Sequence, residues 1–216
     1  MDKEITNNGI AKSRKASIRE DRENRILEKA EEVFAELGYV GATTGLIAKK
    51  AGVSKASLHY YFATKEILYR QIITDICDKW LSAAGTFEHE SNPAIALSGY
   101  LEVKIDLSRS RPNASKIWAN ELIHGAKFTQ DYLKTKVKPW FEERVKIIEG
   151  WIKNGLIDPI DPATLLYMIW GSTQTFSDFE SQIIILNDGQ PLRDEQFEEV
   201  KKTVIHIFLK GVGIKL

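Results

Sequence analysis

The 216-residue chain lacks several features that define common classes of protein. Its one cysteine, Cys77, cannot form an intrachain disulfide and has no second cysteine nearby with which to begin a thiolate zinc site. The N-terminal residues contain no apolar signal-peptide core, and the longest aliphatic run, Ile183 to Leu186, is far too short to span a membrane. We therefore expect a cytoplasmic protein with no membrane partner.

Motifs of catalysis and cofactor binding are also missing. The chain has no P-loop, no G-x-G-x-x-G dinucleotide fingerprint and no G-x-S-x-G nucleophile elbow. Its histidines show no metal-ligand spacing; they are His59, His89, His124 and His206. We therefore expect no enzyme, no cofactor and no metal site.

Acidic residues are absent from one stretch of a chain whose 30 basic and 30 acidic residues otherwise balance. No Asp or Glu occurs from Leu37 to Lys65, where the basic residues are Lys49, Lys50, Lys55 and Lys65. Such a stretch is either a solvated basic face or a contact surface for nucleic acid, and composition alone leaves both readings open.

Strand patterns are nearly absent, which predicts an all-α fold. Residues 1–16 show no periodicity and are expected to form a flexible arm, whose contact with DNA stays open. Ser17 and Glu20 have the spacing of a capping box, and apolar residues then recur at helical steps from Ile26 to Leu37, before Gly38. We expect a three-helix head over residues 17–65, followed by a larger helical domain over residues 66–216.

Helix-breaking residues divide the larger domain into several predicted long helices. A proline inside one of them, Pro139, is expected to kink it, whereas Asp161 followed by Pro162 is a strong helix start. The predicted helices cover about Lys65 to Ala84, Pro93 to Arg109, Asn113 to Gly125, Phe128 to Lys153, Pro162 to Leu186, and Asp194 to Gly211.

Residues Thr43 to Phe62 have the pattern of a helix-turn-helix. A short helix ends at Ala51, Gly52 makes the sharp turn, and Ser54 caps a second short helix that runs to Tyr61. In this arrangement the second helix can enter the major groove of DNA while the first lies across the phosphates.

The second helix has an apolar face, from Leu58 to Phe62, that is expected to be buried. The opposite edge is then free to meet base edges, through Lys55, Ala56, Ser57 and His59. The hydroxyls of Tyr60 and Tyr61 and the ammonium of Lys65 are expected to reach phosphates. The competing interpretation is a helical hairpin that only packs, with its aromatic residues in the core.

The segment I-A-K-K-A-G-V-S-K-A-S-L-H-Y-Y-F-A-T-K-E-I-L, Ile47 to Leu68, resembles the tetracycline-repressor family. The resemblance implies an all-helical homodimer whose two heads bind a near-palindromic operator. Carried over by position, it implies that Lys55, Ser57 and His59 read bases and that Thr43, Tyr60, Tyr61 and Lys65 contact phosphates. The sequence departs from the family at Thr44, where an apolar residue is usual, and at Gly45, a poor helix former, so the family's pattern does not fix the start of the first short helix.

Mixed aromatic and polar faces in the larger domain predict a pocket for a small molecule. One face is a stripe on the helix from Pro162, and two others lie on earlier helices. The candidate ligand-binding residues are Cys77, Trp80, Trp118, Glu121, Tyr167, Trp170, Gln174 and Asp178. For each tryptophan, a place in the hydrophobic core is an equally good interpretation.

Two further segments, Ser108 to Leu122 and Gly150 to Phe179, resemble the branch of the family that contains the bacterial regulator of pyrimidine utilisation, a branch that senses uracil and thymine. An amide such as Gln174 can pair with one edge of uracil while Trp170 covers a face, and a carboxylate can accept from a ring nitrogen. A lipophilic cation is the competing ligand, since aromatic faces and carboxylates suit it too. A helical protein-interaction module is the alternative from another class.

The last helix carries an apolar stripe from Phe197 to Val212 that needs a partner. With the helix from Pro162 it is expected to form a homodimer interface across a two-fold axis. Ligand binding is then expected to shift the helix after Thr64 and to change the spacing of the two heads.

Overall fold

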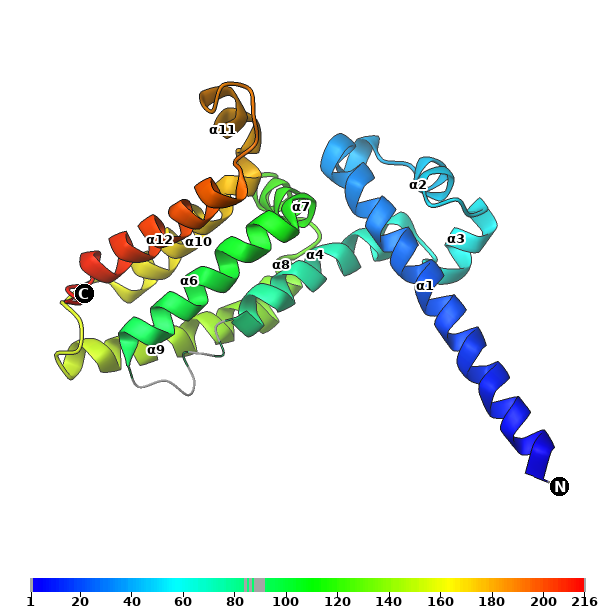
Figure 1. Ribbon diagram of the computed structural model, residues 1–216, viewed down its shortest axis with the longest axis horizontal. Helices are drawn as coiled ribbons and strands as arrows, with labels where there is room; N and C mark the ends of the chain where they lie inside the picture. The colour runs from blue at the N-terminus through cyan, green and yellow to red at the C-terminus, as the bar shows by residue number, and fades with distance from the viewer. Residues whose placement is uncertain (1, 84, 86, 88–91, 216) are drawn as a thin grey trace. The chain divides into compact units, whose positions relative to one another are not determined.

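The computed structural model of the protein describes residues 2–83, 85, 87 and 92–215, with side chains from Ser17 onward (Figure 1). Every regular element in this part of the chain is helical, which confirms the all-α prediction. Contacts divide the chain into two compact units, Met1–Ile72 and Ile73–Leu216. Helix α4 (Lys65–Ala83) therefore crosses the boundary, which lies later than the expected one after residue 65. No helix within the described ranges has the length and apolarity needed to cross a membrane.

The first unit consists of α1 (Asp2–Gly41), α2 (Thr44–Lys50), α3 (Lys55–Tyr61) and the beginning of α4. Helix α1 starts well before the capping-box pattern at Ser17, so that pattern lies inside a helix, and its N-terminal part extends past α2 and α3 (Figure 1). Gly38 interrupts α1 with φ of 66°, a positive value that glycine adopts readily because it has no Cβ, and its ψ of 177° is extended rather than left-handed helical.

The core of the first unit is made by the apolar faces that the periodicity predicted. Leu58 is completely buried and Phe62 is 1% exposed, and each such side chain stabilises the fold by about 1.5–3 kcal/mol. Leu37, the last residue of the predicted stripe on α1, is 42% exposed and lies outside this core. The other fully or almost fully buried members are Ile26, Ala30, Val33, Phe34, Ile47, Ala48 and Leu68.

The second unit is a bundle in which α6 (Pro93–Ser110) packs against both α10 (Pro162–Asp178) and α12 (Asp194–Gly211). Helix α7 (Pro112–Ile123) packs on α10 as well, and these helices lie together in Figure 1. The core contains aromatic and aliphatic side chains of several helices, including Leu97, Tyr100, Leu101, Ile148, Trp151, Leu166, Ile169 and Leu209.

The expected helix from Phe128 to Lys153 is three consecutive elements, α8 (Gln130–Tyr132), η1 (Leu133–Val137) and α9 (Lys138–Lys153). Segment η1 is a π-helix, in which the amide of Lys138 bonds to the carbonyl five residues back, at Leu133. Pro139 follows at once and has no amide to donate, so the predicted disturbance takes the form of a π-turn.

The expected helix from Pro162 to Leu186 is also divided, and the prediction of one continuous helix is wrong. Its start is as predicted, because the carboxylate of Asp161 accepts from the amide of Thr164 at 2.7 Å. Hydrogen bonds from the side chain and then the backbone of Thr164 lower the pKa of Asp161. Helix α10 ends at Asp178, and Phe179 separates it from α11 (Glu180–Leu186). Hydroxyl groups near this end, such as those of Thr173 and Ser177, bond back to carbonyls of the preceding turn, which favours bending.

Candidate nucleic-acid interface and effector site

Helix α3 shows one buried and one exposed edge, as a recognition helix requires. The hydroxyl of Ser54 accepts from the amide of Ser57 at 3.0 Å and so caps the helix, as predicted. Leu58 is buried on the inner side, whereas Lys55 and Ala56 are exposed. The exposed edge therefore places a cation and a small side chain where a base edge can approach.

His59 is exposed on the same edge and has a fixed orientation. Its ring nitrogen Nδ1 lies 3.2 Å from the carbonyl oxygen of Ala63. Since a carbonyl only accepts, the hydrogen of the neutral ring sits on Nδ1 and the other nitrogen, Nε2, remains for another partner. Ser57 is partly exposed beside it, so all four expected base readers lie at least partly at the surface.

The aromatic pair at the end of α3 is split between surface and interior. Tyr60 is 71% exposed, whereas Tyr61 is partly buried, and their rings meet edge to face with centroids 5.3 Å apart. The guanidinium carbon of Arg19 on α1 lies 5.8 Å from the centroid of Tyr60. The sequence analysis missed Arg19, because helical periodicity on α1 does not tell which other helix its exposed face meets.

Thr43 and Lys65, both expected to contact phosphates, have structural partners. The hydroxyl oxygen of Thr43 caps α2 by accepting from the amide of Leu46 at 3.2 Å, which leaves its hydrogen to donate. The ammonium of Lys65 donates to the carbonyls of Tyr39 at 2.7 Å and Ala42 at 2.9 Å. Lys65 therefore joins the start of α4 to the end of α1 and keeps at most one N–H for a phosphate.

Fewer lysines of the basic stretch are free to contact DNA than its composition suggests. Lys49 and Lys55 are exposed, but Lys50 pairs with Glu36 at 3.2 Å and Lys65 is held by backbone carbonyls. The positive charge of the stretch persists, while only part of it is free to move toward a duplex.

In the second unit, four of the eight expected ligand-binding residues are buried. Cys77 and Trp80 on α4 are 3% and 4% exposed, and the ring of Trp80 meets that of Trp118 on α7 edge to face at 6.0 Å. Burial raises the pKa of Cys77 to about 12, so its thiol is neutral. Glu121 is also buried, and its carboxylate accepts from the backbone amide of Phe128 at 2.5 Å.

The expected stripe on α10 divides into two parts. At its C-terminal end, Asp178 accepts from the hydroxyls of Ser115 at 2.7 Å and Ser177 at 3.3 Å, and burial raises the pKa of its carboxyl group. Gln174 is partly buried one turn earlier. At the other end the indole of Trp170 already donates to the hydroxyl of Tyr100 at 2.9 Å.

Tyr167, at the start of the stripe, lies on the surface of the second unit. It is 57% exposed, and its ring stacks on Phe141 with centroids 5.3 Å apart. The structure therefore brings Cys77, Trp80 and Trp118 together and leaves Tyr167 outside that group.

A further residue of this interior was missed. Lys104 on α6 is 2% exposed, and its ammonium lies 4.4 Å from the ring centroid of Trp80. Desolvation lowers the pKa of Lys104 to about 7, while Cys77 and Asp178 act in the opposite direction. The signal was present in the sequence, because Lys104 falls at helical steps from Leu97 and Leu101 and so lies on the buried face of its helix.

Comparisons with known proteins agree with this geometry. Residues 26–72 match the family described as "Bacterial regulatory proteins, tetR family", and residues 73–215 match "YcdC-like protein, C-terminal region". The chain is 37% identical over 188 residues to the HTH-type transcriptional regulator RutR of Escherichia coli (strain K12), a match that covers 87% of this chain and 88% of that protein.

Solved structures share the fold. The ketosteroid transcriptional regulator KstR2 of Mycobacterium tuberculosis gives a TM-score of 0.72 at 21% identity, over 90% of this chain and 96% of that one. AibR, solved in complex with isovaleryl coenzyme A and operator DNA, gives a TM-score of 0.67 at 19% identity, over 86% of this chain and 97% of that one.

Proposed function

The chain belongs to the TetR family of DNA-binding transcriptional regulators, and from this premise we propose that it is a homodimeric repressor released from its operator by a pyrimidine base such as uracil. It acts on DNA in the bacterial cytoplasm. The observation that carries the proposal is the two-sided character of α3, whose inner edge is fixed by Leu58 and whose outer edge presents Lys55 and His59.

Lys55 and His59 recognise DNA together with neighbouring residues of the first unit. Lys55, Ser57 and His59 contact base edges in the major groove, and the small Ala56 allows the helix to approach closely. Tyr60 holds the phosphate backbone. The same contacts are expected from Thr43 and Tyr61, and from the one free N–H of Lys65.

A homodimer is supported by an apolar groove on one face of the second unit. The groove has a volume of about 490 Å³ and lies between α10 and α12. Met168 and Ile207 line the groove and are 59% and 60% exposed. Large apolar side chains that gather on one exposed face indicate a surface that contacts a partner. Two copies joined there present two α3 helices to half-sites about 34–36 Å apart on a near-palindromic operator.

A pyrimidine effector is supported by the resemblance of two segments to the pyrimidine-utilisation branch and by the interior of the second unit. Aromatic rings of Trp80 and Trp118 suit a flat ring, and Gln174 offers an amide for pairing. Trp170 is available through its ring face only, because its N–H is bonded to Tyr100. The competing lipophilic cation is disfavoured by Lys104, since two positive charges repel strongly in a dry interior.

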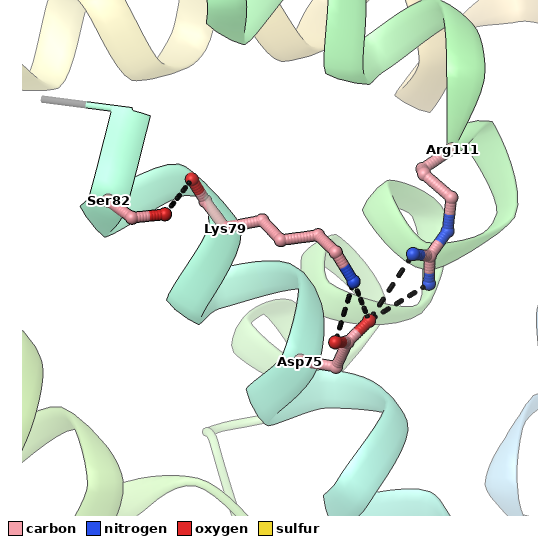
Figure 2. Close-up of polar contacts among 4 residues, drawn as sticks. All are labelled: Asp75, Lys79, Ser82 and Arg111. Atoms are coloured by element: carbon pink, nitrogen blue, oxygen red, sulfur yellow. Dashed lines mark hydrogen bonds and ion pairs between the residues drawn. The ribbon is translucent and has the colours of Figure 1, made fainter.

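Helix α4 provides the connection between effector and DNA, because it crosses from the first unit into the second. Figure 2 shows how its position is held: the carboxylate of Asp75 accepts from Lys79 at 2.5 Å and from Arg111, just before α7, at 3.2 Å. An effector beside Trp80 and Cys77 pushes on this helix about half a turn to one and a half turns further along than Asp75. Release requires that the effector bind the shifted state more tightly than the operator-bound state.

Selection of bound sequences from a random DNA pool, repeated with uracil, thymine and a cationic dye, tests the proposal. A palindromic consensus that is lost on addition of uracil supports it. Failure to enrich any sequence would favour a helical protein-interaction module instead, and loss of binding with the dye alone would favour a regulator of efflux or catabolism with a cationic effector. Light scattering of the purified protein tests the homodimer.

A further inference from the structure

Among the described residues of the second unit, one buried lysine has no hydrogen-bond partner. Lys104 is 2% exposed, and no hydrogen bond or ion pair of its ammonium occurs among the described residues. The groups that act on it electrostatically are Cys77 from α4 and Asp178 from α10. Cys77 is a neutral thiol, and Asp178 is already bonded to two hydroxyls, so neither serves as a direct partner.

A second donor beside it is also unsatisfied. The indole nitrogen of Trp80 is buried and has no hydrogen-bond partner, and the ring of the same residue lies under the ammonium of Lys104. A buried donor without an acceptor costs about 1–3 kcal/mol, and a charged one costs more. Proteins tolerate such groups where a ligand supplies what is missing, as at binding and catalytic sites.

We infer that the effector presents an oxygen acceptor to the ammonium of Lys104 and the indole N–H of Trp80, and that it belongs to the class of flat, acidic oxo-heterocycles bound as the anion. This inference rests on the proposed function, since it assigns the chemistry of the same effector site. Two neighbouring donors, one above the Trp80 ring and one at its edge, call for an acceptor, and the buried positive charge favours an acceptor that is negative.

The surrounding side chains fit the same class of ligand. The rings of Trp80 and Trp118 meet edge to face and provide flat apolar surfaces, which favour a planar ring over a flexible chain. Asp178 is held by Ser115 and Ser177 and can accept from a ring N–H. Uracil meets these requirements as a weak acid, and 5-fluorouracil meets them better because fluorine makes its ring N–H more acidic.

Calorimetric titration with uracil and 5-fluorouracil tests the inference on the full-length protein. For the parent protein we expect 5-fluorouracil to bind several-fold more tightly than uracil. Lys104→Met, which keeps the length of the side chain, should weaken 5-fluorouracil binding by on the order of 10- to 100-fold and abolish the preference between the two. Trp80→Phe should weaken both ligands by a smaller factor, because it removes a neutral donor.

Two controls separate these effects from general damage. Trp151→Phe makes the same change at a buried tryptophan of the hydrophobic core and should leave both affinities unchanged. Proton uptake, measured from the enthalpy in buffers of different ionisation enthalpy slightly above neutral pH, should accompany binding of barbiturate, which is already an anion in solution, to the parent protein and vanish in Lys104→Met. Lysine is partly neutral there, because burial lowers the pKa of Lys104 to about 7, and Cys77 and Asp178 are the other titratable groups that face it.

Different binding results would overturn the inference and the proposed function on which it rests. If uracil binds but neither the acidity of the analogue nor Lys104→Met changes the affinity, the inference is wrong while the pyrimidine effector stands. If neither uracil nor 5-fluorouracil binds and the anion barbiturate does, in a manner that depends on Lys104, the inference stands and uracil as the proposed effector is wrong. Preferential binding of ethidium, a flat cation, overturns both.

Discussion

Replacing Lys104 by methionine should make the ligand-free protein more stable. The unfolded chain keeps the pKa of this lysine at its ordinary 10.5, whereas burial lowers the pKa to about 7 in the fold. Each unit of difference corresponds to about 1.4 kcal/mol, so keeping the charge inside the fold costs at most about 5 kcal/mol. Methionine has a similar length and no charge to bury, and we expect a gain of about 2–4 kcal/mol near neutral pH.

The sign of the pH dependence follows from the same shift. Between pH 7 and 10.5 the unfolded chain binds more protons at this position than the folded chain does, so stability rises with pH across that window. Below pH 7 both states are protonated and the full cost is present. Lys104→Met should therefore flatten the rise of stability with pH between 7 and 10, and the gain over the parent should be largest at pH 7 or below.

Urea unfolding of the parent and the variant at several pH values, followed by circular dichroism, measures both effects. Near neutral pH the gain corresponds to a rise in Tm of roughly 5–10 °C for a chain of this size. Lys201→Met is the matched control, because Lys201 is almost as buried but its ammonium lies 2.7 Å from Asp106 and 3.0 Å from Glu198, which raise its pKa. That variant should lose stability, and a Lys104→Met protein less stable than its parent at neutral pH would refute the reasoning.

Other changes test the DNA-binding unit and the connecting helix. Lys65→Met should lower the stability of the first unit and weaken binding to all DNA sequences. A filter-binding series at several salt concentrations separates the two roles of the side chain. If the role is structural, the slope of log affinity against log salt concentration stays unchanged, whereas loss of a phosphate contact reduces that slope by about one. Lys55→Gln should change the base preference in a selection experiment, and an unaltered consensus would contradict the assignment of α3. Asp75→Asn should cost no more than about 1 kcal/mol in urea unfolding, since the group is partly exposed, yet shift the effector concentration that releases the operator. The Cys77 thiol, with its pKa raised to about 12, should resist alkylation by iodoacetamide in the native protein at pH 8 and react in urea; fast labelling of the folded chain would contradict its burial.

Local patterns of the sequence predicted the elements of the fold with good accuracy. The turn at Gly52, the cap at Ser54 and the buried pair Leu58 and Phe62 all follow from rules that act within a few residues, and the structure has each of them. The break of α10 at Phe179 was not predicted, because no proline or glycine stands between Ser172 and Asp188 and the hydroxyls that bend the helix give no periodic signal.

Contacts between residues that are far apart in the chain could not be predicted from the sequence. Lys65 was assigned to phosphate from its position at a helix start, but the carbonyls that hold it belong to Tyr39 and Ala42, far back in the chain. A helical stripe likewise tells which residues share a side without telling what covers that side, so Tyr167 was grouped with buried residues although it is 57% exposed. Lys104 could have been found, because a lysine at core spacing is itself unusual.

The contact between His59 and the carbonyl of Ala63 has a consequence for the operator. With its hydrogen fixed on Nδ1, the neutral ring offers a lone pair on Nε2, so it selects the amino group of cytosine or adenine, whereas the ammonium of Lys55 selects the oxygen and N7 of guanine. The two residues are four apart on α3, about 6 Å along the helix, which matches roughly two base-pair steps of 3.4 Å. Each half-site should therefore contain a G·C pair whose guanine is contacted by Lys55 and, about two base-pair steps away, a second pair in which His59 contacts the amino group of a cytosine or adenine.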